Sequence, residues 1–571
     1  MATHPSTVLD APDTAPDAVA SPAPECRRPA ALDAGLLLIT VAVPLAFTIF
    51  SWAPFADTKL VFLALGTLLI SIGGVPLDRR LAIAAGAWFG VTVIASIWGV
   101  DPLRSLTGYD FPLTGLAMLA PCAYLVVAGA SLPPRAVARM RRWVVWTGVL
   151  MAVVLLVAKL LPGVLRAAIP DLTFSGSTAG NPVFAAAVMT VALSALLGSE
   201  AAATRRFTAR PVVTLVVLAS GISLAGERSA WLLPMIAVPL TLWWFRVPIR
   251  RSLVLGAVVV VTCATWVAAQ PLLPTVTSPV GQLTFAGDSG RLTAFVVHTR
   301  AALDRPVLGW GPANSFSAFR ATATEAEIDR SSPGWSEAHN IFIQTAVTTG
   351  LIGLGAFVAL VVLIASRARR ADRRIAWVVG AVGALAAFNF YEPFELSVTP
   401  LAFLLAGVAA GTATRGGRTG APGLRQGVGR IVIGAGLAGT LVLSMLVAIS
   451  STFQHVGERY ESEWALRRSL QLQPWRLATV DALAEDLALD SRAGKPGAAE
   501  EASRLIADAV REHPWDPLIR IRGVDVEALS RDFAAARAYL RDQVERFPGD
   551  AAFLPPERAI RETPVSAEDL T

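Results

Sequence analysis

Long apolar stretches recur along this chain and constrain its fold more than any other feature. Each is close to the length that a helix needs to cross the roughly 30 Å hydrocarbon core of a bilayer. Hydrophobic residues make up 54% of the 571 residues and charged residues 16%, which is typical of a polytopic membrane protein and excludes a soluble globular one. We therefore predict an all-α fold, a polytopic helical membrane protein with about 12 to 13 transmembrane helices. The thirteen predicted spans are 34–51, 60–75, 81–98, 113–130, 143–161, 181–198, 211–226, 229–245, 252–269, 340–366, 375–391, 398–413 and 431–452.

Arginines gather in alternate loops between these stretches. One set of loops holds 23 arginines, and the intervening short loops hold five basic residues. Those five are Lys59, Arg104, Lys159, Arg166 and Arg228. Because basic loops stay in the cytoplasm, we predict a cytoplasmic N-terminus, an outer loop over residues 270–338 and an outer C-terminus. The expected location is the cytoplasmic (inner) membrane, with several passes.

The chain divides into three predicted regions. Residues 1–30 are rich in Ala, Pro and Asp without periodicity, which indicates a disordered cytoplasmic tail. Residues 31–452 form the transmembrane core. Residues 453–571 have helical periodicity, with a proline recurring where helices are expected to stop. Such spacing resembles tetratricopeptide repeats, so we predict an extracytoplasmic helical-repeat domain that is a candidate site for a protein partner.

A single histidine lies where a polar cluster runs into a long apolar helix, in WSEAHNIFIQTAVTTGLIGL. His339 is therefore expected at the boundary between membrane and water. With Ser336 as the N-cap, His339 would lie in the first helical turn, where the positive end of the helix dipole favours a neutral imidazole. A neutral imidazole can accept a proton. The alternative is a residue that only hydrogen-bonds a neighbouring loop.

Two arginines are expected on the same outer side. Arg228, in LAGERSAW, lies between two apolar stretches, where an ionisable group is costly and tends to mark a substrate pathway. The alternative for Arg228 is a side chain that extends to the interface and has no other role. Arg291, in GDSGRLTAF, begins an amphipathic stretch within the long loop. The alternative for Arg291 is an ion pair with Asp288 or Asp304.

Four further residues are candidates for positioning an acceptor. Glu392 and Glu395, in NFYEPFELS, are expected on the outer side, although loop carboxylates often only face water. Trp310 and Trp335 lie in the second half of the long loop and can stack on sugar rings. The alternative for both tryptophans is an anchor at the membrane interface.

The metal-binding residue types are scattered. The five histidines, His4, His298, His339, His455 and His513, do not fall at paired ligand spacings. The three cysteines suggest neither a disulfide framework nor a metal site. We predict no metal and no cofactor, and the formal charge of +6 gives no reason to expect a nucleic-acid partner.

The order of the motifs resembles a known family. GSTAGNPVFAAAV, LAGERSAW, GDSGRLTAFVVHTRAALDRPVLGWGPANSF and EAHNIFIQTAVTTGLIGL follow one another as in the O-antigen ligase and polymerase superfamily of bacterial membrane glycosyltransferases. The resemblance covers roughly residues 175–400. It implies transfer of a glycan from a polyprenyl-diphosphate-linked donor to a glycan, lipid or protein acceptor at the outer face of the membrane. It also implies that His339, Arg228 and Arg291 are the functional residues.

The chemistry of these residue types agrees with that implication. A diphosphate leaving group needs fixed positive charge, and guanidinium is a permanently charged, forked donor that fits phosphate oxygens. An acceptor hydroxyl is a weak nucleophile unless a base takes its proton, and His339 is the candidate. Direct displacement would invert the anomeric centre, with arginines in place of a metal cation.

Two other kinds of function fit a polytopic protein with outward arginines. One is a transporter or flippase of a polyprenyl-linked glycan, but such proteins commonly have duplicated halves, and no internal repeat is evident in this sequence. The other is an assembly scaffold in which residues 453–571 do the work, which leaves the motifs around His339 unexplained.

Overall fold

The computed structural model describes residues 28–108, 113–164, 177–201, 209–247, 249–269, 290–331, 335–372, 375–411 and 424–552. These residues form helices and connecting turns, without a strand, so the predicted all-helical fold class is confirmed. Each predicted span corresponds to a helix. The first is α1 (Pro29–Leu37), which continues through the π-helical η1 (Leu38–Ala42) into α2 (Val43–Leu45). The others are α3 (Asp57–Ile72), α4 (Arg79–Trp98), α6 (Leu116–Gly129), α7 (Pro134–Leu160), α9 (Pro182–Ala201), α10 (Ala209–Leu224), α11 (Arg228–Trp244), α12 (Ile249–Ala269), α16 (Ile341–Ala368), α17 (Ala376–Tyr391), α18 (Thr399–Gly411) and α19 (Leu424–Tyr460).

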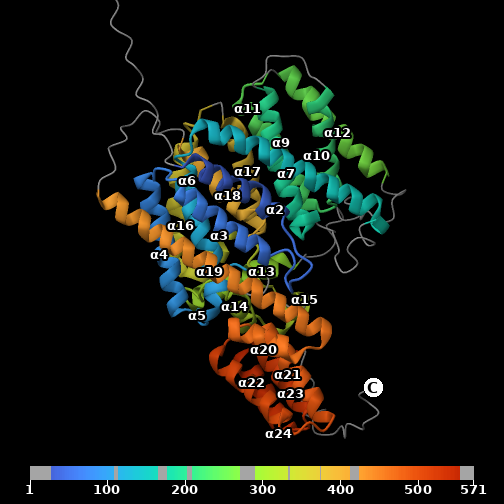
Figure 1. The fold of residues 1–571 in the computed structure, drawn as a ribbon. Helices are drawn as coiled ribbons and strands as arrows, with labels where there is room; N and C mark the ends of the chain where they lie inside the picture. Colours follow the sequence, from blue (N-terminus) through green and yellow to red (C-terminus); the bar gives the residue numbers. More distant parts are fainter. Residues whose placement is uncertain are drawn as a thin grey trace, which may run out of the picture.

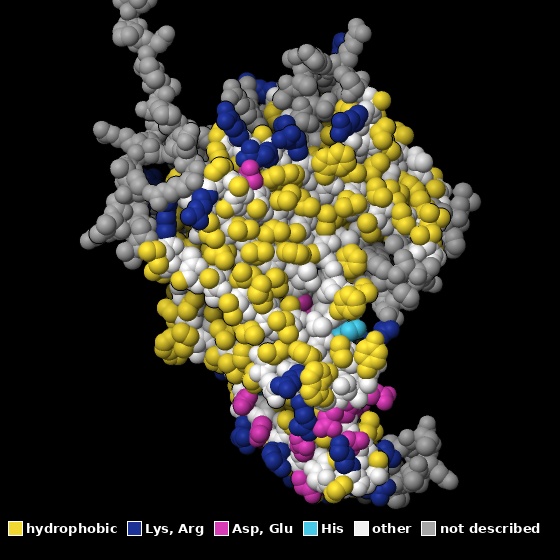
Figure 2. Space-filling model, in the orientation of Figure 1, with side chains coloured by type: hydrophobic (Ala, Val, Ile, Leu, Met, Phe, Trp, Pro, Cys, Tyr) yellow, Lys and Arg dark blue, Asp and Glu magenta, His cyan; other side chains and the backbone are white. Residues whose placement is uncertain are grey.

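The lengths of these helices fit a multi-pass membrane protein. Among the described residues, α4, α7, α16 and Gly429–Tyr460 of α19 are long and apolar enough to cross a membrane, and eight shorter apolar helices accompany them. Figure 2 shows hydrophobic side chains as a broad band across the visible face of the larger part of the molecule. The exact count of thirteen crossings stays a prediction.

The bundle packs around α9, which is apolar on all sides and contacts α7, α10, α11 and α17. The helix begins with a capping pattern, because the Asn181 side chain accepts a hydrogen bond from Val183 N at 2.8 Å and Pro182 is the first helical residue. Elsewhere small residues allow close helix contact. A Cβ atom on Gly407 of α18 would lie 2.2 Å from the Val126 carbonyl oxygen of α6, so only glycine fits there.

The loop between α12 and α16, which is predicted to lie on the outer side and is called the outer loop here, contributes three short helices, α13 (Arg291–Asp304), α14 (Ser315–Thr322) and α15 (Glu325–Ser331). The loop is tied to α16 where that helix is broken at Gly350, whose φ of 67° and ψ of −174° are non-helical. Trp310 N donates to Val347 O at 2.7 Å, Gly311 N to Thr348 O at 3.0 Å, and Leu351 N to Pro306 O at 2.7 Å. Loop and membrane helix are therefore joined through their backbones.

The C-terminal part is a separate lobe of short helices at one end of the bundle (Figure 1). Its helices are α20 (Glu463–Leu472), α21 (Leu477–Arg492), α22 (Ala498–Glu512), α23 (Pro517–Leu529) and α24 (Phe533–Arg546), followed by the 3-10 turn η7 (Pro548–Ala552). Pro474, Pro514 and Pro548 lie between or just after these helices, where the sequence places helix ends. A tetratricopeptide fold and a domain boundary at residue 453 stay predictions, and α19 itself continues from the core to Tyr460.

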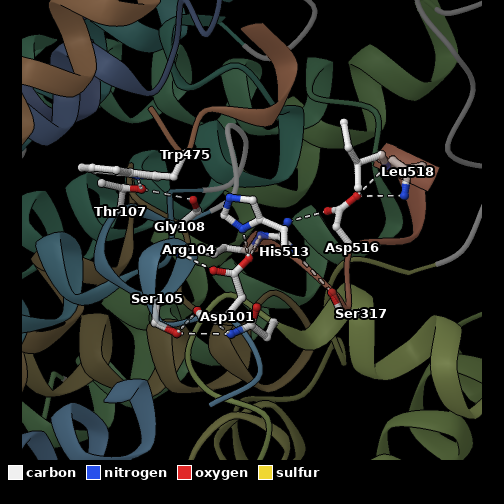
Figure 3. Close-up of polar contacts among 12 residues, drawn as sticks. Asp101, Arg104, Ser105, Thr107, Gly108, Ser317, Trp475, His513, Asp516 and Leu518 are labelled. Atoms are coloured by element: carbon white, nitrogen blue, oxygen red, sulfur yellow. Dashed lines mark hydrogen bonds and ion pairs between the residues drawn. The ribbon is translucent and has the colours of Figure 1, made fainter. Parts of the chain in front are cut away.

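The lobe is docked onto the bundle by buried charges (Figure 3). Asp101 lies just before α5 (Pro102–Thr107) and accepts a hydrogen bond from His513 Nδ1 at 2.5 Å, while Arg104 pairs with Asp516. All four side chains are at most 5% exposed. Arg104 also donates to Ser317 of α14 at 3.2 Å. The lobe, α5 and the outer loop therefore share one polar interface.

Candidate active site

Three segments far apart in the sequence meet on the side of the bundle that carries the lobe. They are residues 335–340 before α16, the first turn of α13, and the 391–395 connection between α17 and α18. Together they bring Arg291, Trp335, His339, Glu392 and Glu395 to one place. Sequence reasoning singled out all five, but only the fold shows which of them touch.

His339 lies just outside α16. The N-cap is Asn340, whose side chain accepts from Phe342 N at 2.9 Å and Ile343 N at 3.2 Å. The expectation that Ser336 caps this helix and that His339 lies in its first turn is therefore wrong. His339 instead has a φ of 48°, a left-handed conformation that costs free energy in a non-glycine residue and tends to occur at functional sites.

The hydrogen bonding of His339 determines which ring nitrogen can act as a base. Its Nδ1 lies 3.0 Å from the carbonyl oxygen of Tyr391. A carbonyl oxygen only accepts, so the neutral ring carries its proton on Nδ1 and has its lone pair on Nε2. The arrangement thus leaves Nε2 as the nitrogen that can take a proton from a bound hydroxyl.

Glu392 joins the histidine to the first arginine. Its Oε1 accepts from Arg291 Nη2 at 3.0 Å, and its Oε2 lies 3.6 Å from His339 Nδ1. The guanidinium of Arg291 also lies over the Tyr391 ring at 5.8 Å. Arg291 thus pairs with Glu392, which the sequence did not indicate. Of the two partners named for the alternative, Asp304 is at the far end of α13 and Asp288 lies outside the described residues.

Trp335 fixes the other side of the imidazole. Its ring meets the His339 ring edge to face, with centroids 4.5 Å apart. It also covers Gly290, the residue before α13, where φ is 72° and an added Cβ would lie 2.9 Å from the indole. Trp335 therefore holds together the two segments that carry His339 and Arg291.

Two buried carboxyl groups lie behind this contact. Burial, together with the charge of Glu392, raises the pKa of Glu395 to about 8, although Lys59 opposes the shift. Burial and the charges of Glu395 and Glu392 likewise raise the pKa of Glu337 well above its usual value. Carboxyl groups that keep their proton at neutral pH can donate a hydrogen bond to a substrate oxygen.

Sequence reasoning missed Glu337 and Lys59. Glu337 lies within the WSEAHN cluster and is 6% exposed, so its closeness to His339 in the chain was an available signal. Lys59 donates from Nζ to Thr178 O and to Ser397 Oγ, both at 2.8 Å. Nothing local in the sequence indicates these two contacts, which join residues 119 and 338 positions apart.

The remaining residues of interest are Arg228, Trp310 and His298. Arg228 is the first residue of α11, and its side chain lies outside the described part of the structure. Trp310 is 4% exposed and packs against Trp515 of the lobe, so its contacts here are packing contacts and its role with an acceptor stays a prediction. His298 is fully buried in α13, and burial lowers its pKa to about 4.

Comparison with protein families identifies the part of the chain that carries these residues. Residues 213–358 match the family model described as O-Antigen ligase. This segment of the chain is similar to O-antigen ligases. The matched segment includes Arg228, Arg291 and His339 and ends before Glu392. No curated protein matches the chain.

The match supports a role in cell-surface glycan assembly and a glycosyltransferase-like activity, and the apolar helices support a multi-pass membrane protein. In the described residues of the chain, no group of three or more His, Cys, Asp or Glu side chains is arranged to hold a metal ion. The residues that face one another at the site are instead arginine, histidine and carboxyl groups.

Proposed function

We propose that the protein transfers a glycan from a polyprenyl diphosphate to an acceptor hydroxyl on the outer face of the cytoplasmic membrane. The observation that carries the proposal is the hydrogen bond from His339 Nδ1 to Tyr391 O, which leaves Nε2 as the basic nitrogen of a ring that lies beside Glu392, the partner of Arg291. This arrangement combines a proton acceptor with a fixed cation, and both are needed when a hydroxyl displaces a diphosphate.

Arg291 is proposed to bind the diphosphate of the donor. Its side chain is 36% exposed, and Glu392 contacts it at one terminal nitrogen, Nη2. A guanidinium has five N–H donors, so the others are available for phosphate oxygens while Glu392 keeps the group oriented. Arg228 is proposed as the second arginine, on the basis of the family resemblance and its place at the start of α11.

His339 is proposed to take the proton of the acceptor. The acceptor oxygen attacks the anomeric carbon, the bond from that carbon to the diphosphate oxygen breaks, and the hydroxyl proton passes to His339 Nε2. Polyprenyl diphosphate leaves with the electron pair of the broken bond. A single displacement of this kind inverts the anomeric centre, and the imidazolium that forms is stabilised by the nearby Glu392 carboxylate.

Glu395 and Glu337 are proposed to position the acceptor. Since the pKa of Glu395 is raised to about 8, it is mostly protonated at neutral pH and can donate to one sugar oxygen while accepting from another. Glu337 Oε1 is buried and has no hydrogen-bond partner among the described residues. A hydroxyl of the acceptor could donate a hydrogen bond to that oxygen. Without such a bond, its burial costs free energy.

Incubation of the purified full chain with a lipid-linked glycan and candidate acceptors tests the proposal. The expected result is a longer or acceptor-linked glycan, with inverted anomeric configuration by NMR and with release of polyprenyl diphosphate. We also expect activity to persist in the presence of a chelator, because arginines are proposed to replace a cation. Movement of intact donor across vesicles without any transfer would contradict the proposal and support the transporter alternative.

A further inference from the structure

A second polar site lies on the opposite face of the bundle. It is a cavity of about 390 Å³ between α7, α9 and α10. Arg141, Arg142 and Arg210 are its charged lining residues in the described part of the chain. Neither the family match nor the glycan-transfer proposal uses these arginines.

The contacts of α7 place this cavity far from His339. Met151, in the second half of α7, accepts a hydrogen bond from Ser177 Oγ. The neighbouring Thr178 binds Lys59, whose charge acts on Glu395 of the candidate active site. The two arginines of α7, Arg141 and Arg142, precede Met151 by nine or more residues, or about 14 Å of helix. Figure 2 shows that Lys and Arg side chains gather at the end of the molecule away from α20–α24.

The lining of the cavity changes from charged to apolar along the helices. Arg142 lies in the first half of α7 and Arg210 in the first turn of α10, and Val145, Trp146 and Val149 follow farther along α7. The Arg210 guanidinium lies over the Trp146 ring at 6.0 Å, and Trp146 is 59% exposed. An exposed tryptophan next to arginines is typical of the headgroup level of a membrane.

This gradient indicates the kind of ligand. Guanidinium groups bind phosphate oxygens with forked hydrogen bonds. A free phosphate would use the arginines and leave the apolar lining unfilled. A phospholipid would use both, since its phosphate lies at the depth of the arginines and its acyl chain continues along the apolar part.

We propose that the cavity between α7, α9 and α10 binds an anionic phospholipid, with the headgroup phosphate on Arg142 and Arg210 and an acyl chain against Trp146 and Val149. Arg141 adds a third positive charge at the same level. The site is separate from glycan transfer, so either proposal can fail without the other. Occupation would tie three helices of the bundle to one lipid.

The test compares lipid retention by two double variants of the full chain. Arg142→Gln with Arg210→Gln removes two charges from the cavity. Arg369→Gln with Arg370→Gln removes two exposed charges just after α16, on the same face and outside the cavity. Protein in nanodiscs of phosphatidylcholine with one-fifth phosphatidylglycerol is extracted in mild detergent, and bound lipid is counted by native mass spectrometry. We expect about tenfold weaker retention of phosphatidylglycerol in the cavity variant. A change of this size corresponds to the loss of one charge-assisted hydrogen bond.

Each outcome supports or overturns the proposal. Retention of phosphatidylglycerol over phosphatidylcholine, unaffected by millimolar inorganic phosphate and by the control substitutions, supports a phospholipid site. Equal retention of the two lipids, or an equal loss in the control variant, overturns it. Competition by inorganic phosphate would assign a simple anion site in its place. Arg210→Lys keeps the charge and still tests the proposal if the double variant does not fold. It is expected to weaken retention about threefold, because lysine lacks the forked pair of N–H donors of a guanidinium.

Discussion

Two buried clusters of ionisable side chains lie on the side of the molecule that carries the lobe, and they are built differently. In the docking cluster, Asp101 is paired with His513, and Arg104 with Asp516. In the candidate active site, three glutamates, Glu337, Glu392 and Glu395, lie close to one arginine and one histidine.

The pKa values of the acids reflect this difference. Burial raises the pKa of Asp101, but the hydrogen bond from His513 and the charges of Arg104 and His513 outweigh it, so the net shift is downward. At the active site, burial and like charges act together and raise the pKa values of Glu337 and Glu395. A cluster of paired charges is suited to holding two parts together, whereas an excess of one charge type is suited to receiving a ligand.

The largest effect is expected from His339→Ala. Loss of a general base should lower turnover by about 10²- to 10⁴-fold, with donor binding largely kept. The matched control is His455→Ala, a half-buried histidine of α19. Glycan transfer by both variants is measured with the same donor. Turnover of His339→Ala at the wild-type rate would contradict the base assignment and favour a purely electrostatic site.

The next effect concerns the docking cluster. Arg104→Ala leaves the buried carboxylate of Asp516 without this partner, and breaking a buried pair costs about 3–5 kcal/mol. Hydrogen exchange in α22 and α23 should therefore accelerate, while transfer to a small acceptor continues, because we expect the lobe not to be required for the chemical step. In Arg511→Ala, the control, an exposed pair with Asp508 is lost and little change is expected. Equal exchange in the two variants would mean that the docking cluster does not hold the lobe.

A smaller effect is expected from Arg291→Lys, which keeps the charge and loses the fork. Since lysine cannot contact Glu392 and two phosphate oxygens in one plane, we expect transfer to fall about 10- to 100-fold. Arg300→Lys is the matched control, because Arg300 belongs to the same helix and pairs with Glu327 at 2.5 Å. If both variants lost activity to the same extent, the loss would come from a disturbed α13 helix and not from a role of Arg291 in the site.

The smallest effect is a pH dependence of stability from Glu395. Its pKa is raised from 4.5 to about 8, so the folded protein holds this proton more tightly than the unfolded chain. Its contribution to stability is therefore fully present below about pH 4.5 and is lost as the pH rises toward about 8. Glu395→Gln, which cannot ionise, should flatten the fall in melting temperature over this window. An unchanged pH profile would show that Glu395 is already ionised in the folded protein.

The sequence was sufficient for features that depend on local pattern. Apolar runs predicted the helices that correspond to the thirteen spans, and Arg291 was placed correctly at the start of α13. The N-cap of α16 could not be predicted in this way. Ser336 and Asn340 are both residue types that cap helices, and only the observed backbone shows that Asn340 is the cap.

Contacts between distant segments could not be predicted in the same way. Asp101 and His513 are 412 positions apart, and Arg291 and Glu392 are 101 apart. Many other acidic and basic residues of the sequence are chemically able to form the same kinds of pair. The family resemblance implied roles for Arg291 and His339 but gave no indication that Glu392 contacts both of them.

The join at Gly350 affects how such a protein can diversify. Val347 O and Thr348 O receive Trp310 N and Gly311 N, and every donor and acceptor in that join belongs to the peptide backbone. Glycine is required at Gly350 because an added Cβ would lie 2.2 Å from Val307 O. Part of the contact between the outer loop and α16 is therefore independent of side-chain identity. Side chains elsewhere in the loop can change while these backbone hydrogen bonds are kept, and with them the place of His339 just before the same helix.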